Sequence, residues 1–178
     1  MSALPSQSRY IIGTEACERF SFYGMKSILM LYMTGHLLMS DNWATSTLHI
    51  FVGMVYLLPL AGAWLADKVW GRYKTILYIS LLYCVGHGVL ATADLFHTIE
   101  ARRYILMAGL FIIALGAGGI KPCVSAFMGD QIPNKSPQLM TKAFNAFYWA
   151  INLGSFFSFL VIPAMDCLLY TSDAADDL

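Results

Sequence analysis

Five apolar stretches without Asp, Glu, Lys or Arg divide this chain, at residues 27–40, 42–66, 75–93, 104–120 and 143–165. A helix that crosses a bilayer needs about 20 mostly apolar residues, and the second, third and fifth stretches reach that length. The first and fourth stretches become long enough only when charged residues at their ends are included. The pattern predicts five membrane-spanning helices, at about residues 11–39, 44–66, 74–96, 102–128 and 142–165.

The composition supports a membrane protein and excludes several other classes. Of the 178 residues, 58% are apolar and 12% are charged, whereas a soluble domain has about 25% charged residues. The 11 basic and 11 acidic residues balance without a basic run, so we expect a lipid bilayer as a partner and no nucleic acid. The four cysteines lie far apart, which favours packing roles over a metal site or a disulfide.

Basic residues outside the spans predict how the chain is oriented. With the N-terminus inside, the inner side collects Arg9, Lys68, Arg72, Lys74, Lys135 and Lys142. The outer side holds Arg102 and Arg103. Because an excess of basic residues marks the cytoplasmic side, we expect a multi-pass protein of the plasma (inner) membrane with a cytoplasmic N-terminus. A signal peptide is not expected, since the N-terminus has no basic region before an apolar core.

The first span carries its charged residues on one face. At 100° per residue, an arc of about 100° holds Glu15, Glu18, Arg19, Phe22 and Lys26. Glu15 and Arg19 form an i,i+4 pair in the favourable order. Lys26 lies about 10 Å deeper along the axis than Arg19. Two interpretations stay open: a buried cluster that a proton could switch, or a helix start at the headgroup level with Lys26 reaching back to the surface.

Other polar residues lie at membrane depth in the later spans. His49 and Tyr56 share a face of the second span, where the histidine is either a hydrogen-bonded structural residue or a proton site. Tyr148 and Asn152 share a face of the fifth span by their i,i+4 spacing, and interhelical hydrogen bonding is the alternative role for the amide. Lys121 requires a carboxylate partner, for which the two glutamates of the first span are the candidates.

The glycines before this lysine, in the stretch GAGGIKP at residues 116–122, favour close helix packing. A phosphate loop is disfavoured because the GK[ST] ending is missing and the stretch lies within an apolar helix.

Three motifs resemble those of the proton-dependent oligopeptide transporters, the POT or PTR family of the major facilitator superfamily. Residues 15–24 (EACERFSFYG) resemble the ExxERFxYYG signature. Residues 118–127 (GGIKPCVSAF) resemble the family's fourth-helix signature, and residues 147–155 (FYWAINLGS) resemble FYxxINxGS. Residues 67–74 (DKVWGRYK) are similar to a loop motif of the whole superfamily. The resemblance covers about residues 9–162.

The resemblance implies an all-α membrane protein with five transmembrane helices of an incomplete six-helix N-terminal major facilitator bundle. It also implies a symporter that carries di- and tripeptides with protons, by alternating access between two bundles. The expected partners are a di- or tripeptide and a C-terminal helical bundle that this chain lacks. No cofactor and no metal are expected beyond protons as the coupling ion.

The resemblance also implies roles for individual residues. The proton-coupling positions are Glu15, Glu18, Arg19, His49 and Lys121. The peptide-site positions are Tyr23, Lys26, Tyr56, Tyr148 and Asn152. The cytoplasmic gate positions are Asp67, Arg72 and Lys74. The chain departs from the family at Lys26, where many members have an arginine that can grip a carboxylate in two places, and at Phe22, where the signature has a tyrosine.

The end of the chain departs from the family pattern. We expect residues 1–165 to form the partial N-terminal bundle and residues 166–178 to be a non-native or disordered tail, as after a truncated reading frame. A genuine acidic external loop is the alternative.

Other functions stay open beside peptide symport. They are transport of nitrate or another solute on the same fold, an inert truncated product, and an intramembrane enzyme. An enzyme is disfavoured because the sequence has no nucleophile–base pair and no metal-ligand spacing such as HExxH.

Overall fold

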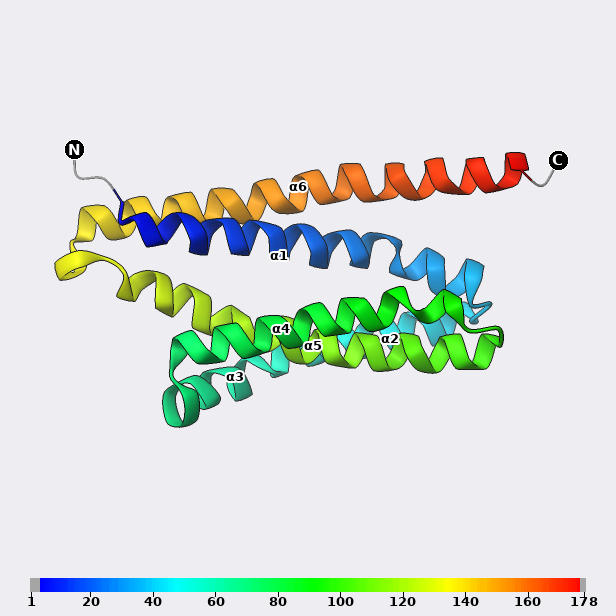
Figure 1. Ribbon diagram of the computed structural model, residues 1–178, viewed down its shortest axis with the longest axis horizontal. Coiled ribbons are helices and arrows are strands. Elements are labelled where there is room, and N and C mark those ends of the chain that lie inside the picture. The colour runs from blue at the N-terminus through cyan, green and yellow to red at the C-terminus, as the bar shows by residue number, and fades with distance from the viewer. Residues whose placement is uncertain (1–3, 177–178) are drawn as a thin grey trace. The chain divides into compact units, whose positions relative to one another are not determined.

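Helices joined by short connections form the residues that the computed structural model describes, 4–176 (Figure 1). For residues 135 and 168–176 the description covers the backbone alone. The elements are α1 (Ser6–Leu31), η1 (Tyr32–His36), α2 (Asp41–Leu57), α3 (Pro59–Leu65), η2 (Ala66–Trp70), α4 (Arg72–Ala91), η3 (Ala93–Leu95), α5 (Ile99–Asp130), η4 (Pro133–Lys135) and α6 (Pro137–Asp176). No strand occurs among these residues, so the prediction of an all-α fold is confirmed.

Each predicted membrane span corresponds to helical structure. Within the described part of the chain, four helices are long and apolar enough to cross a membrane: Asp41–Trp70, Arg72–Leu95, Ile99–Asp130 and Pro137–Cys167. Helix α1 corresponds to the first predicted span and, with 26 residues, is about 39 Å long. Helix α1 differs from the other four in its charged residues and not in its length.

Helix α6 extends further than the apolar pattern predicts. It begins at Pro137 and continues to Asp176, although Pro163 lies inside it, whereas the predicted span covers residues 142–165. Proline removes one backbone hydrogen bond, which does not end the helix here. The boundary at residue 165 and the nature of residues 166–178 stay predictions, and residues 177–178 lie outside the described part.

The described residues form two compact units. One contains the chain up to Tyr32 together with the part from Gln131 onward, and the other extends from Met33 to Asp130. In the first unit, α1 and α6 lie side by side and run in the same direction (Figure 1). A Cβ added at Gly154 would lie 2.5 Å from the carbonyl oxygen of Ala16, so small residues allow these two helices to approach closely.

A polar contact fixes the same pair of helices. The hydroxyl of Ser158, which is fully buried, donates a hydrogen bond of 2.7 Å to the carbonyl oxygen of Phe20. A Cβ added at Gly24 would lie 2.9 Å from that hydroxyl oxygen and 2.6 Å from Cγ1 of Ile162. These contacts hold the middle of α1, where the charged face lies, against α6.

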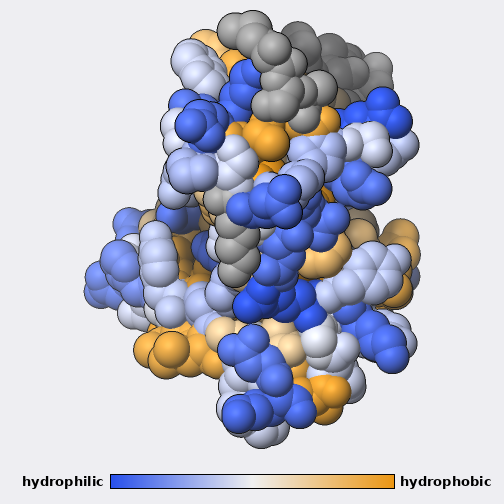
Figure 2. Space-filling view, turned by 90° about the vertical axis from the view of Figure 1, so that its left-hand side faces the viewer, coloured by the Kyte–Doolittle hydropathy of each residue, from blue (hydrophilic) through white to orange (hydrophobic). Residues whose placement is uncertain are grey.

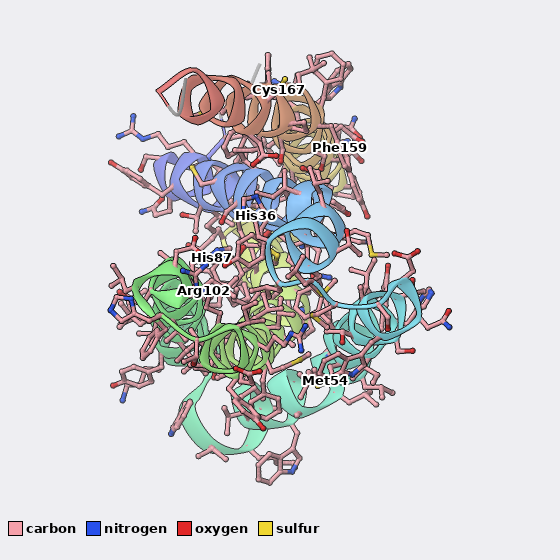
Figure 3. The ribbon with its side chains drawn as sticks, turned by 90° about the vertical axis from the view of Figure 1, so that its right-hand side faces the viewer. His36, Met54, His87, Arg102, Phe159 and Cys167 are labelled. Carbon is pink, nitrogen blue, oxygen red and sulfur yellow. The ribbon has the colours of Figure 1, made fainter. Side chains whose placement is uncertain are left out.

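Helix α5 is the centre of the second unit, where it packs against α2, α3 and α4. Figure 3 shows His87 and Arg102 on the α4 and α5 side of this unit and Met54 on the α2 side. A Cβ added at Gly62 would lie 2.5 Å from Cα of Gly119, and one added at Gly116 would lie 2.6 Å from Cβ of Tyr83. The glycines of α5 therefore serve close helix packing, as the sequence predicts.

Arg103 closes the turn between η1 and α2. Its Nε and Nη2 donate hydrogen bonds of 3.0 and 2.7 Å to the carbonyl oxygen of Leu37, and Nη2 donates another of 2.8 Å to that of Leu38. Leu38 has a φ of +48°, which is uncommon outside glycine. The guanidinium also lies 5.5 Å from the ring centroid of Trp43. One side chain of α5 therefore satisfies the carbonyls of a strained turn.

The contact between Gly62 and Gly119 leads to a stability prediction. We expect Gly62→Ala to destabilise the protein by about 1–3 kcal/mol because the new methyl group overlaps backbone atoms of α5. Gly53→Ala in α2 is the matched control, since nothing lies within 4 Å of a Cβ there, and alanine should stabilise the helix by up to about 1 kcal/mol. Thermal unfolding in detergent, followed by circular dichroism, measures both. Equal unfolding temperatures for the two variants would contradict the prediction.

Candidate functional site

A buried charge cluster, formed by Glu15, Glu18 and Arg19, lies on α1. These residues are 3%, 9% and 8% exposed. The guanidinium contacts Oε1 of Glu15 through Nη2 and Nε, each at 2.7 Å. Its Nε also lies 3.1 Å from Oε2 of Glu18. The i,i+4 spacing that the sequence shows thus produces a charge-assisted contact within one helix.

This charge cluster contains more acidic than basic groups. Two carboxylates share one guanidinium, and all three groups are largely removed from water. A buried charge is stable only while it is paired and hydrogen-bonded. A proton on either carboxylate would remove the excess negative charge and would change which partner the guanidinium holds.

Tyr23 and Lys26 continue the same helix toward its C-terminal end. The ring of Tyr23 lies 5.6 Å from that of Phe22 and 5.7 Å from that of Phe159 on α6. Phe22 occupies the position where the signature has a tyrosine, and its ring is buried. Lys26 is half-buried, and the part of the chain that the structure describes provides no ion pair for it.

A hollow on α6 brings the two predicted substrate residues of that helix together. It has a volume of about 290 Å³ and is lined by Asn145, Tyr148, Trp149 and Asn152. The amide nitrogen of Asn152 donates a hydrogen bond of 2.7 Å to the carbonyl oxygen of Tyr148. The sequence analysis did not include Asn145 and Trp149, although their i,i+3 and i,i+4 spacing places them on the same face.

In the second unit, Lys121 and Tyr56 come together from α5 and α2. The ammonium of Lys121 lies 5.4 Å from the ring centroid of Tyr56, within the range of a cation–π contact. Tyr56 is 75% exposed. His49 is also exposed, about two helical turns before Tyr56, and no hydrogen bond or ion pair is seen for it among the described residues.

The expected gate residues lie around the start of α4. Arg72 forms an ion pair with Asp130 at the end of α5, and the rings of Tyr73 and Phe127 contact each other beside it, with centroids 6.2 Å apart. Asp67 and Lys74 are exposed. Asp130 was not predicted as a site residue, although a carboxylate that closes the apolar run of α5 could have indicated it.

The predicted proton-coupling set is thus divided between the two units. The structure brings Glu15, Glu18 and Arg19 together in the first unit. His49 and Lys121 belong to the second unit, so the predicted pairing of Lys121 with the glutamates stays a prediction.

The sequence of this chain is similar to a family model and to curated proteins. A family model described as the POT family matches residues 73–167. "Peptide transporter family 1" of Drosophila melanogaster is 45% identical over 163 residues, which are 90% of this chain and 22% of that protein. Human "Solute carrier family 15 member 2" is 40% identical over 166 residues, 92% of this chain and 23% of that protein. The chain thus spans less than a quarter of the length of these curated relatives.

A solved structure shows the same similarity in three dimensions. The crystal structure of the POT family transporter PepTSo matches 92% of this chain and 32% of its own length, with a TM-score of 0.82 and 47% sequence identity. Over this part, the fold of the chain is similar to that of this transporter.

The charge cluster leads to a second stability prediction. We expect Glu15→Ala to destabilise the protein by about 3 kcal/mol, because removal of one partner leaves the buried Arg19 with weaker pairing. Glu100→Ala, an exposed glutamate in the first turn of α5, is the matched control and should change stability by less than about 0.5 kcal/mol. Thermal unfolding of the purified protein measures both variants. If the two variants unfolded at the same temperature, the cluster would have no structural role.

Proposed function

Because this chain belongs to the POT family, we propose that it is the N-terminal part of a symporter that carries di- and tripeptides together with protons. The observation that carries the proposal is the buried charge cluster, in which two carboxylates of helix α1 share one guanidinium. Transport would proceed by alternating access, and the second half of the path would come from a C-terminal helical bundle. The relatives named as peptide transporters support the same substrate class.

The protein would act as a carrier in the plasma (inner) membrane and not as an enzyme. The four long apolar helices and the membership of a transporter family support a multi-pass membrane protein. The excess of basic residues near Arg72 and Lys74 supports a cytoplasmic position for the start of α4. The N-terminus would then also be cytoplasmic.

Proton coupling would start at the charge cluster of α1. Protonation of Glu15 or Glu18 would release Arg19 from one of its partners and permit the helix to change its contacts. His49 would carry protons toward this cluster from the second unit, and Lys121 would be the second cation that responds to the change. The membrane potential would assist proton entry by about 2.3 kcal/mol per charge per 100 mV.

The peptide would be recognised through the groups that all peptides share. Its carboxylate would be attracted by Lys26, a half-buried cation without an ion pair among the described residues. Tyr23, Tyr56 and Tyr148 would form adaptable walls with hydroxyl groups, and Asn152 would offer an amide. The amino terminus of the peptide would bind a carboxylate of the C-terminal bundle. Only protons would be needed as the coupling ion, without a cofactor or metal.

The gate would depend on the contact between the start of α4 and the end of α5. The ion pair between Arg72 and Asp130 supports this role, because it connects the residue after Gly71 to the far end of α5. Gly71 has a φ of +76°, which favours glycine. Asp67 and Lys74 are exposed beside this turn and would be available to partners that change as the gate opens.

Uptake by reconstituted protein tests the substrate and the driving force together. We expect the full-length protein in liposomes to accumulate a labelled dipeptide when the inside is more alkaline than the outside. Unlabelled tripeptides should compete, and nitrate should not. Hydrolysis of the dipeptide without accumulation would contradict the proposal, and so would competition by nitrate alone. The 178-residue chain alone should show no uptake, since it corresponds to less than a third of the length of the transporters it matches.

Substitution of Glu18 tests the coupling step separately. We expect Glu18→Gln to abolish uptake driven by a pH gradient, because an amide cannot take up the proton. Exchange of labelled for unlabelled dipeptide, which needs no net proton movement, should be partly retained. Glu100→Gln on the surface of α5 is the control and should retain both activities. Full gradient-driven uptake by Glu18→Gln would overturn the role of the cluster in proton coupling.

A further inference from the structure

An apolar groove lies on the second unit, and none of the residues that line it is assigned to transport. It has a volume of about 390 Å³ and is lined by residues of α3, η2, α4 and α5, together with Leu58 between α2 and α3. Leu58, Leu65 and Leu82 provide apolar walls, and Gly62 with Gly119 forms part of the floor where the backbones meet. We call this feature the α3–α4 groove. Its lining contains no charged residue.

Three aromatic side chains with polar atoms border the groove. Trp64, Trp70 and Tyr78 belong to its lining and are 61%, 42% and 49% exposed. The rings of Trp70 and Tyr78 are held edge to face at a centroid distance of 5.4 Å. Within residues 4–176, their indole and phenol groups form no hydrogen bond. Tryptophan and tyrosine are typical of the membrane–water boundary, where one end is apolar and the other polar.

Two lysines belong to η2 and to the start of α4, the elements that form one end of the groove. Lys74 precedes Tyr78 by one turn of α4, and Lys68 lies in η2 between the lining residues Leu65 and Trp70. Both are exposed, and within the described residues neither forms an ion pair. Arg72 is paired with Asp130, so the two lysines together with Asp67 leave one net positive charge here. Figure 2 faces this end and shows hydrophilic side chains directly beside hydrophobic ones.

We propose that the α3–α4 groove binds one anionic phospholipid, with an acyl chain between α3 and α4 and the phosphate at Lys68 and Lys74. The apolar lining suits a hydrocarbon chain, since the helices that form it are long enough to cross a membrane. The indole and phenol groups can donate hydrogen bonds to ester and phosphate oxygens. Basic residues beside transmembrane helices attract anionic lipids of the cytoplasmic leaflet, which is the side that the orientation rule assigns to this end.

The charge distribution distinguishes this occupant from the others. A neutral lipid would use the apolar lining but would leave the lysines without a role. A second copy of the chain would bring its own two lysines to a contact that lies on a symmetry axis, so that like charges would meet. An anionic headgroup at the end of an acyl chain complements both parts of the groove.

Native mass spectrometry of the full-length protein in detergent provides the test. The probes are phosphatidylglycerol and phosphatidylcholine with the same palmitoyl and oleoyl chains. We expect the anionic lipid to bind more tightly, by about five-fold for each lysine it contacts. Lys68→Gln combined with Lys74→Gln should remove this preference and leave phosphatidylcholine binding unchanged. Lys142→Gln, an exposed lysine on α6, should leave the preference intact. Equal binding of the two lipids, or an equal loss in Lys142→Gln, would overturn the proposal.

A second variant tests the apolar part of the site. Ala61 is exposed and lines the groove, so Ala61→Phe should fill it and weaken the binding of both lipids. Ala91→Phe, an exposed position at the other end of α4, is the matched control. The oligomeric state of each variant is measured in parallel by light scattering. If Ala61→Phe changed the oligomeric state and left lipid binding unchanged, the groove would be a protein interface and the proposal would be wrong.

Discussion

The ion pair between Glu15 and Arg19 is the constraint on which the rest of the first unit depends. Charged groups away from water require partners, and here α1 provides them from its own sequence, one turn apart. This pairing holds only while α1 stays helical. The contacts of Ser158 and Gly154 with the α1 backbone maintain that helix beside α6. The charge chemistry and the small-residue packing are therefore two parts of one arrangement.

The helices of this chain could be predicted from sequence because a membrane-spanning segment needs only sufficient length and apolar character. Backbone groups in hydrocarbon must be paired within the segment, so each long apolar stretch becomes a helix. The ends of the helices were less predictable. The helix of α6 continues to Asp176, where no proline or glycine follows Met165 to end it, although the apolar run itself stops at residue 165. The π-helical turns at η1 and η2 were not predicted, because they change local geometry without changing hydropathy.

In the candidate site, contacts within one helix could be predicted from sequence, whereas contacts between helices could not. The pairs Glu15 with Arg19 and Tyr148 with Asn152 follow from the helical repeat, and the structure brings each pair together. The ion pair of Arg72 with Asp130 and the approach of Lys121 to Tyr56 were not predicted. Such contacts depend on how neighbouring helices are rotated and shifted along their axes. A single sequence carries that information only in the packing of residues such as Gly62 and Gly119.

The two ends of the second unit are stabilised by different kinds of arginine contact. Arg72 pairs with the side-chain carboxylate of Asp130, whereas Arg103 donates hydrogen bonds to the backbone carbonyls of Leu37 and Leu38. The contact of Arg103 therefore does not depend on which side chains stand at positions 37 and 38. A substitution of Asp130 would remove the contact at one end, whereas substitutions at positions 37 and 38 would leave the contact at the other end in place, so the two ends tolerate sequence change unequally.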